Sequence, residues 1–179
     1  MTIWEVMADA DRERWEYLPS ISVGPLRFGM SPAEAAAVLG NFTAELTPVR
    51  ADNALKAEYR RPAPPPWFRG AVTAYFGPSD GLFCVVVDAQ SGPQVVMDDI
   101  ELVGRVPSHV EAQLLEHLKA RDIVLRYQPE GDPEAEELGL TMRAQRVGDL
   151  LLTRPVFAVL GERAYTLWDV VPADELEVR

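Results

Sequence analysis

The chain has 179 residues, of which 47% are hydrophobic and 25% are charged, a composition typical of a globular protein rather than a disordered or fibrous one. The 28 acidic and 17 basic residues give a net charge of −11, which argues against nucleic acid as the ligand, because phosphate binding needs clustered lysine and arginine. No apolar run approaches the roughly 20 residues of a membrane span, and the first residues lack the pattern of a signal peptide, so we expect a single compact cytoplasmic domain over residues 1–179.

An N-terminal helix is the first element that the sequence predicts, at about residues 2–17. Thr2 and Glu5 have the spacing of a capping box, in which a hydroxyl caps the helix start and a carboxylate three residues later reaches back to it. Trp4 and Trp15 would both lie on this helix, packed across the rest of the domain or against another chain.

The segment GPLRFGMSPAEAAAVLG, residues 24–40, predicts a strand, a tight turn and a short helix. Ser31 takes the N-cap position, Glu34 completes a capping box, and Pro32 occupies the first helical position, where its missing N–H costs nothing. Gly40 can end the helix in the left-handed conformation. We expect this segment to build the fold rather than a functional site.

A third helix is expected from Ser108 to about Ala120, again with a hydroxyl as its cap. Val110, Leu114, Leu115 and Leu118 are spaced at helical intervals, so they predict a buried apolar stripe along this helix.

Strand-type segments fill most of the remaining chain: FTAEL, LKAEYRR, AVTAYFG, GLFCVVVDA, IVLRY, LGLTMRAQ, LLLTRPVFAVLG and RAYTLWDVV. Two hairpins are expected, at residues 72–88 and 156–171, and the order of a helix followed by strands therefore occurs twice. We predict an α+β fold of antiparallel sheets with few short helices. In one version of this fold, two tandem units of a helix and a β-meander cover residues 21–90 and 100–171.

The turn FGMS and the helix that follows it and ends in VLG resemble the turn and helix start of a group of small bacterial domains. This group comprises the SmpA-type outer-membrane assembly lipoproteins and the β-lactamase inhibitor protein, which has two tandem units of helices and an antiparallel sheet. The chain departs from the group in having RVPSHVE where a second GMS would stand, no cysteine near its start and no cysteine pair. The resemblance implies a binding module that acts through the surface of its sheet, without catalytic residues.

Motifs that would indicate chemistry are few. GPSDG, residues 77–81, has the G-x-S-x-G pattern of a serine hydrolase, but the strand-type residues after it favour a turn, with Ser79 as a turn residue. His109 and His117 are eight residues apart, which is too far to hold one zinc ion from adjacent helical turns, and both are expected to be solvated. Cys84 is expected to be a buried thiol. The sequence predicts no catalytic residue, metal or cofactor, and favours a protein that is not an enzyme.

The leading functional hypothesis is a soluble binding protein, of the immunity or inhibitor kind, with a basic protein as its partner. The acidic run EGDPEAEE contains Glu134, Glu136 and Glu137, which form either a solvated loop or a surface complementary to that partner. Trp67 and Phe68 follow a proline-rich stretch, and they either anchor an interface or fold back against the end of a sheet.

The alternative hypothesis is a small-ligand-binding protein or an enzyme with a carboxylate-lined pocket on the sheet. Its candidate residues are Asp88, Asp98, Asp99, Glu101, Arg27 and Arg126. A deep pocket lined by several of these carboxylates would favour this alternative, whereas a flat acidic surface with exposed aromatic rings would favour the binding protein.

Overall fold

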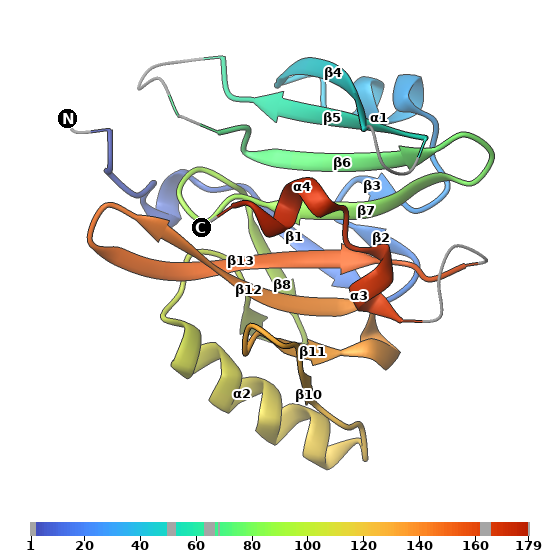
Figure 1. The fold of residues 1–179 in the computed structure, drawn as a ribbon. Coiled ribbons are helices and arrows are strands. Elements are labelled where there is room, and N and C mark those ends of the chain that lie inside the picture. The colour runs from blue at the N-terminus through green and yellow to red at the C-terminus, as the bar shows by residue number, and fades with distance from the viewer. Residues whose placement is uncertain (1–2, 50–52, 63–66, 68, 162–165, 179) are drawn as a thin grey trace.

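A computed structural model of the chain describes residues 3–49, 53–62, 67, 69–161 and 166–178. The fold is α+β, with antiparallel sheets and few short helices, as the sequence predicts (Figure 1). In the described part of the chain, every helix is too short or too polar to cross a membrane.

An eight-stranded antiparallel sheet forms the centre of the molecule, with the strand order β10-β11-β12-β13-β7-β6-β5-β4. Its strands are β4 (Thr43–Val49), β5 (Ala54–Arg60), β6 (Val72–Gly77), β7 (Gly81–Val87), β10 (Arg126–Tyr127), β11 (Pro133–Ala135), β12 (Leu140–Val147) and β13 (Leu150–Ala158). The sheet consists of two meanders, β4–β7 and β10–β13, which meet where β7 pairs with β13. Each meander follows a helix, α1 (Pro32–Val38) or α2 (Pro107–Ala120), so the order of one helix and four strands occurs twice.

The start of α1 confirms the capping prediction. The Ser31 hydroxyl accepts a hydrogen bond from the Glu34 N–H at 3.2 Å, and the Glu34 carboxylate accepts one from the Ser31 N–H at 2.8 Å. The predicted cap of α2 is wrong, because this helix begins at Pro107 with Val106 in the N-cap position and no side-chain cap. Proline at the first helical position fixes the helical φ angle and starts the helix one residue before Ser108. The predicted apolar stripe of α2 is buried at Val110, Leu114 and Leu118, but Leu115 is exposed.

A second sheet of five strands has the order β3-β2-β1-β8-β9. Its strands are β1 (Arg14–Leu18), β2 (Ser22–Val23), β3 (Leu26–Arg27), β8 (Gln94–Met97) and β9 (Ile100–Glu101), and β1 pairs with β8 in parallel.

The helix expected at residues 2–17 is wrong. A short 3-10 turn, η1 (Asp9–Asp11), precedes the strand β1, and Thr2 lies outside the described residues. Trp15 and Tyr17 are buried while Arg14 and Glu16 are exposed, so this stretch follows the two-residue period of a strand.

The central strands of the eight-stranded sheet are buried on both faces, whereas the edge strands β4 and β10 are largely exposed. Val72, Ala74 and Phe76 of β6 contact a core that also contains side chains of β1, α1 and α2, whereas Tyr75 between them contacts a second core. This alternation follows from the geometry of a strand, whose successive side chains point to opposite faces. In Figure 1, the five-stranded sheet and the C-terminal helices accordingly lie on opposite sides of the large sheet.

The C-terminal helices α3 (Leu167–Val170) and α4 (Ala173–Leu176) cover the second core (Figure 1). The hairpin expected at residues 156–171 is therefore wrong in the described part of that range, because Leu167–Val170 is helical; residues 162–165 lie outside the description. The strand β13 instead forms its hairpin with β12, from Leu140↔Phe157 to Val147↔Leu150.

Candidate functional site

The hairpin turn between β8 and β9 has an unusual conformation for its sequence. Asp98 and Asp99 are its two turn residues, and both have positive φ angles, 44° and 69°. A two-residue turn of this kind favours Asn or Asp at its first position and Gly at its second. Asp98 therefore suits the turn, whereas Asp99 stands where glycine is preferred, at a cost of about 1 kcal/mol or more.

Three adjoining hollows, of about 670, 650 and 470 Å³, lie between this hairpin and α2, and Asp99 lines all of them. We call them together the acidic groove and define it by Asp98, Asp99, Glu101, Gln113, Glu116 and His117; Arg14, Arg105 and Arg121 line the same hollows. Of the six defining residues, the first three belong to the hairpin, and the last three lie on one surface of α2 because they are spaced three and four residues apart.

The carboxylates of the acidic groove differ in how they are paired. Glu101 accepts hydrogen bonds from Arg105 and from Arg14 at 3.0 Å, and these bonds hold the pKa of Glu101 below its ordinary value. Asp98 lies 2.7 Å from a guanidinium nitrogen of Arg121 in a pair that is half exposed on both sides. Asp99 is exposed and has no hydrogen-bond or ion-pair partner in the described part of the chain. Of these three hairpin carboxylates, Glu101 is thus neutralised, Asp98 is loosely paired and Asp99 is available.

His117 is half-buried beneath the Asp98–Asp99 turn, so the expectation that it is solvated is wrong, whereas His109 is exposed as expected. The Nε2 atom of His117 lies 3.2 Å from a carboxylate oxygen of Asp98, but this nitrogen is buried and makes no hydrogen bond with any described residue. His117 and Asp98 do not form a metal site with a third ligand, because no group of three metal-ligating side chains occurs among the residues that the structure describes.

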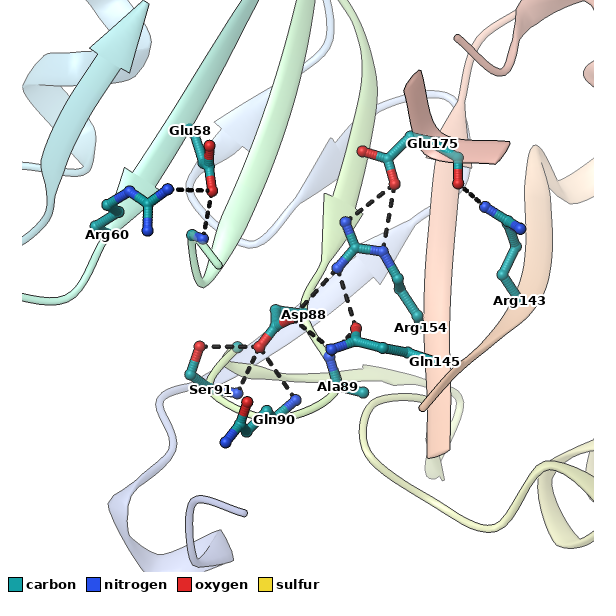
Figure 2. A network of polar contacts seen from close by, with 12 residues as sticks. Glu58, Arg60, Asp88, Ala89, Gln90, Ser91, Arg143, Gln145, Arg154 and Glu175 are labelled. Atoms are coloured by element: carbon teal, nitrogen blue, oxygen red, sulfur yellow. Dashed lines mark hydrogen bonds and ion pairs between the residues drawn. The ribbon is translucent and has the colours of Figure 1, made fainter. Parts of the chain in front are cut away.

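A buried network of charges lies on the other side of the large sheet, under α4 (Figure 2). Arg154, which is only 3% exposed, donates to a carboxylate oxygen of Glu175 at 3.0 Å and lies 3.4 Å from the carboxylate of Asp88. Tyr75 donates its hydroxyl hydrogen to Glu175 at 2.7 Å. We call these four residues the Arg154 network.

Each charge of the Arg154 network has a partner of opposite sign within the network. Burial by itself would raise the pKa of Glu175, but the charge of Arg154 and the hydrogen bonds from Tyr75 and Arg154 hold it below its ordinary value. Burial and the neighbouring carboxylate raise the pKa of Tyr75, so its hydroxyl remains a hydrogen-bond donor. Charges that are buried, paired and hydrogen-bonded in this way hold elements together rather than attract a ligand.

Asp88 also shapes the loop that leads from β7 to β8. One of its carboxylate oxygens accepts hydrogen bonds from the N–H groups of Gln90 and Ser91, at 3.1 and 2.8 Å, and from the Ser91 hydroxyl at 2.9 Å. The buried guanidinium of Arg12 donates to the carbonyl groups of Ala89 and Gln90 in the same loop, at 2.9 and 3.1 Å. This loop is therefore fixed from both sides.

The structure brings together half of the pocket that the alternative hypothesis predicts. Asp98, Asp99 and Glu101 share the acidic groove, but Asp88 belongs to the buried network and does not line it. Arg27 and Arg126 are exposed on β3 and β10, outside the groove. A single pocket made of all six residues does not exist, because burial separates Asp88 from the others.

The predicted acidic surface is also incomplete. Glu134 is buried on β11 and accepts a hydrogen bond from the Gln128 amide at 2.6 Å, because the pairing of β11 with β12 turns it inward. Glu136 is half-buried and lies 3.7 Å from Arg126, whereas Glu137 is exposed. The aromatic pair is divided as well: Trp67 is half-buried, and Phe68 lies outside the described residues.

Sequence reasoning missed the part of the groove that α2 contributes. A shared polar face of this helix could have been predicted from the sequence, because polar residues three and four positions apart lie on one side of a helix. These residues are Gln113, Glu116 and His117. Nothing local in the sequence indicated that the β8–β9 turn lies against that face.

No protein-family model, curated protein or solved structure matches this chain. The resemblance to the SmpA-type lipoproteins and the β-lactamase inhibitor protein therefore stays a prediction, and the function has to be argued from the geometry of the chain itself.

Proposed function

We propose that this protein is a binding protein that holds a basic segment of a protein partner in the acidic groove. The observation that carries the proposal is the unpaired carboxylate of Asp99, which is held in a left-handed turn and lines all three hollows of the groove. Backbone strain at a turn is retained where the side chains have a use, and an unpaired carboxylate in a groove suits a lysine or arginine side chain.

Charge supports a basic partner in two ways. The net charge of −11 attracts a positively charged partner over long distances and raises its association rate. Within the groove, Glu116 is exposed and, like Asp99, has no partner among the described residues, so two carboxylates are available for direct contact.

Arg121 adds a replaceable contact. Its pair with Asp98 is half exposed, and an exposed pair contributes only about 0–1 kcal/mol to stability. A guanidinium or ammonium group of the partner can take the place of Arg121 at little cost, which makes Asp98 a third contact.

The arrangement of nucleophiles supports binding rather than catalysis. Cys84 is buried, and burial raises the pKa of its thiol well above the ordinary value, which opposes formation of the thiolate. Ser79 lies in the turn between β6 and β7, as expected, whereas both histidines lie on α2. No hydrogen bond among the described residues joins a serine or cysteine to either histidine.

The proposal can be tested with an arginine hexapeptide as a surrogate for the basic segment and a glutamate hexapeptide as the opposite charge. We expect the arginine peptide alone to bind, with chemical-shift changes in a ¹H–¹⁵N NMR titration centred on the β8–β9 turn and on α2. Asp99→Asn should weaken this binding about tenfold, as the loss of one charged hydrogen bond does.

The matched control is Glu137→Gln, which removes the same charge from an exposed residue outside the groove. It should lower the affinity by much less. Equal losses in the two variants, or shifts spread over the whole surface, would mean that only the net charge attracts the peptide, and the groove would lose its role.

A further inference from the structure

Beyond the acidic groove, the structure has a hollow of the opposite character. It has a volume of about 640 Å³ and lies where β12 turns into β13, beside the loop that follows β7. We call it the arginine pocket and define it by Trp4, Arg69, Gln90, Gln145, Arg146 and Asp149. We propose that the arginine pocket binds a small ligand that carries an oxyanion, a carboxylate or a phosphate, on a planar ring.

The two arginines are the first reason. Arg69 is exposed and has no hydrogen-bond or ion-pair partner in the described part of the chain. Arg146 donates its Nε hydrogen to the Gly148 carbonyl oxygen at 2.8 Å, and its two terminal nitrogens have no partner among the same residues. Two guanidinium groups thus face one hollow with most of their donors unused.

Such arginines are uncommon in this chain, because carboxylates outnumber cations and pair with most of them. The described arginines and lysines without a carboxylate within ion-pair distance are Arg12, Arg27, Arg69, Lys119 and Arg146. Two of these line the same hollow. Guanidinium groups form paired hydrogen bonds with carboxylate and phosphate oxygens, which identifies an oxyanion as the matching ligand group.

The walls of the arginine pocket are fixed before any ligand arrives. The Gln90 amide nitrogen donates to the carbonyl oxygens of Ile3 and Glu5, at 2.7 and 2.9 Å, and so ties down the segment that carries Trp4. The Gln145 amide donates to Asp88 at 2.9 Å and accepts from Arg154 at 3.1 Å, so it extends the Arg154 network to the pocket wall (Figure 2). A pocket with rigid walls loses little entropy when it binds a ligand.

Trp4 supplies a surface for the ring of the ligand. Trp4 is 49% exposed, lines the pocket and packs over Gly148. A Cβ atom at Gly148 would lie 3.1 Å from the Cβ atom and 3.2 Å from the Cγ atom of Trp4, and Gly148 has a φ angle of 59°. Glycine is therefore needed at this position, both for the turn and for the indole to lie beside the arginines. Because Trp4 is half exposed and lines the hollow, part of its indole borders the space for the ligand, and an indole stacks favourably with a planar ring.

Asp149 restricts the charge of the ligand. It lines the same pocket, and its negative charge together with the positive charges of the two arginines gives the pocket a net charge of about +1. A ligand with one compact oxyanion fits this balance, whereas a polyanion would be repelled by the aspartate.

Direct binding of four simple probes tests the proposal: benzoate and phenyl phosphate, which join a ring to an oxyanion, and acetate and inorganic phosphate, which lack the ring. The Nε–H signals of the arginines and the indole N–H signal of Trp4 report binding in ¹H–¹⁵N spectra of the whole chain. We expect saturable shifts with at least one of the two ring compounds, and the stronger of them identifies the oxyanion as carboxylate or phosphate.

Variants locate the site. Arg69→Gln and Arg146→Gln should each weaken the binding about tenfold, the loss expected for a charged hydrogen bond. Arg27→Gln is the matched control, because Arg27 is also exposed and has no ion-pair partner among the described residues, but lies on β3; it should leave the affinity unchanged. Asp99→Asn should also have no effect, so this result is independent of the acidic groove.

Three results would overturn the proposal. They are the absence of saturable shifts with either ring compound, equal losses in the Arg27 and Arg69 variants, and binding of acetate or inorganic phosphate as tight as that of the ring compounds.

Discussion

The Arg154 network and the acidic groove contain the same kinds of residues, yet they differ in the environment of their charges. In the network, Arg154 and Glu175 are almost fully buried and each charge has a partner of opposite sign. In the groove, Asp99 is exposed without a partner, and Asp98 shares a half-exposed pair with Arg121. Charged residues therefore serve stability where they are enclosed and recognition where they are left open, and predictions about each region should differ accordingly.

The largest effect is expected from removing the central cation of the network. Arg154→Met leaves two carboxylates, Asp88 and Glu175, buried without their counterion, so we expect a loss of about 3–5 kcal/mol in the free energy of unfolding. Urea denaturation monitored by circular dichroism measures this loss.

The same substitution in the groove provides the comparison. Arg121→Met breaks a pair that is half exposed on both sides, and it should change the free energy of unfolding by about 1 kcal/mol or less. Similar losses in the two variants would contradict the division between an enclosed and an open region.

Acid should weaken the network in a predictable direction. The pKa of Glu175 is lower in the folded chain than its ordinary value of 4.5, so the stabilisation by this carboxylate is complete above pH 4.5 and is lost as the pH falls through the lower, folded-state pKa. The difference in stability between the wild type and Glu175→Gln should therefore be largest near neutral pH and shrink in acid. Denaturation curves between pH 3 and 7 test this, and a difference that grows toward low pH would show that Glu175 is not held ionised.

Salt should affect the groove more than the network. The Debye length falls from about 10 Å at 0.1 M to about 3 Å at 1 M salt, which screens exposed charges far more than buried ones. Binding of the arginine hexapeptide should weaken severalfold over this range, mainly through slower association, while the destabilisation caused by Arg154→Met should stay nearly constant. Stopped-flow kinetics and denaturation at the two salt concentrations measure the two parts, and binding that does not respond to salt would argue against an electrostatic groove.

Local signals in the sequence were sufficient for parts of the fold. Ser31, Pro32 and Glu34 act within one helical turn, so the start of α1 could be predicted from them. The predicted N-terminal helix is wrong because the spacing of Thr2 and Glu5 concerns only one helical turn, whereas the alternation in Arg14–Leu18 extends over five residues and marks a strand.

At the C-terminal helix α3 the sequence predicts a strand where the structure has a helix. Thr166 and Asp169 have capping spacing, and the Thr166 hydroxyl accepts a hydrogen bond from the Asp169 N–H at 3.4 Å. The apolar residues around Leu167 concealed this signal, since a short apolar run is found both in buried strands and in short helices that cover a core.

The functional regions were predictable only where their residues are close in sequence. Asp98, Asp99 and Glu101 could be grouped because they lie within four positions of one another. Arg154 could not be grouped with Asp88 and Glu175, which are 66 and 21 residues away, because only the pairing of β13 with β7 and the packing of α4 bring them together.

The most direct test of the central claim replaces Asp98–Asp99 by Asn-Gly and measures stability and peptide binding on the same sample. Asn-Gly suits the positive φ angles of this turn, so the variant should unfold with a free energy about 1 kcal/mol higher than the wild type. It should also bind the arginine hexapeptide at least tenfold more weakly, because two groove carboxylates are gone. The variant Glu130→Gln/Glu137→Gln removes equal charge outside the groove and should show neither effect to a comparable degree. A chain that is more stable but binds less supports a turn retained for recognition; a loss of stability, or unchanged binding, would contradict it.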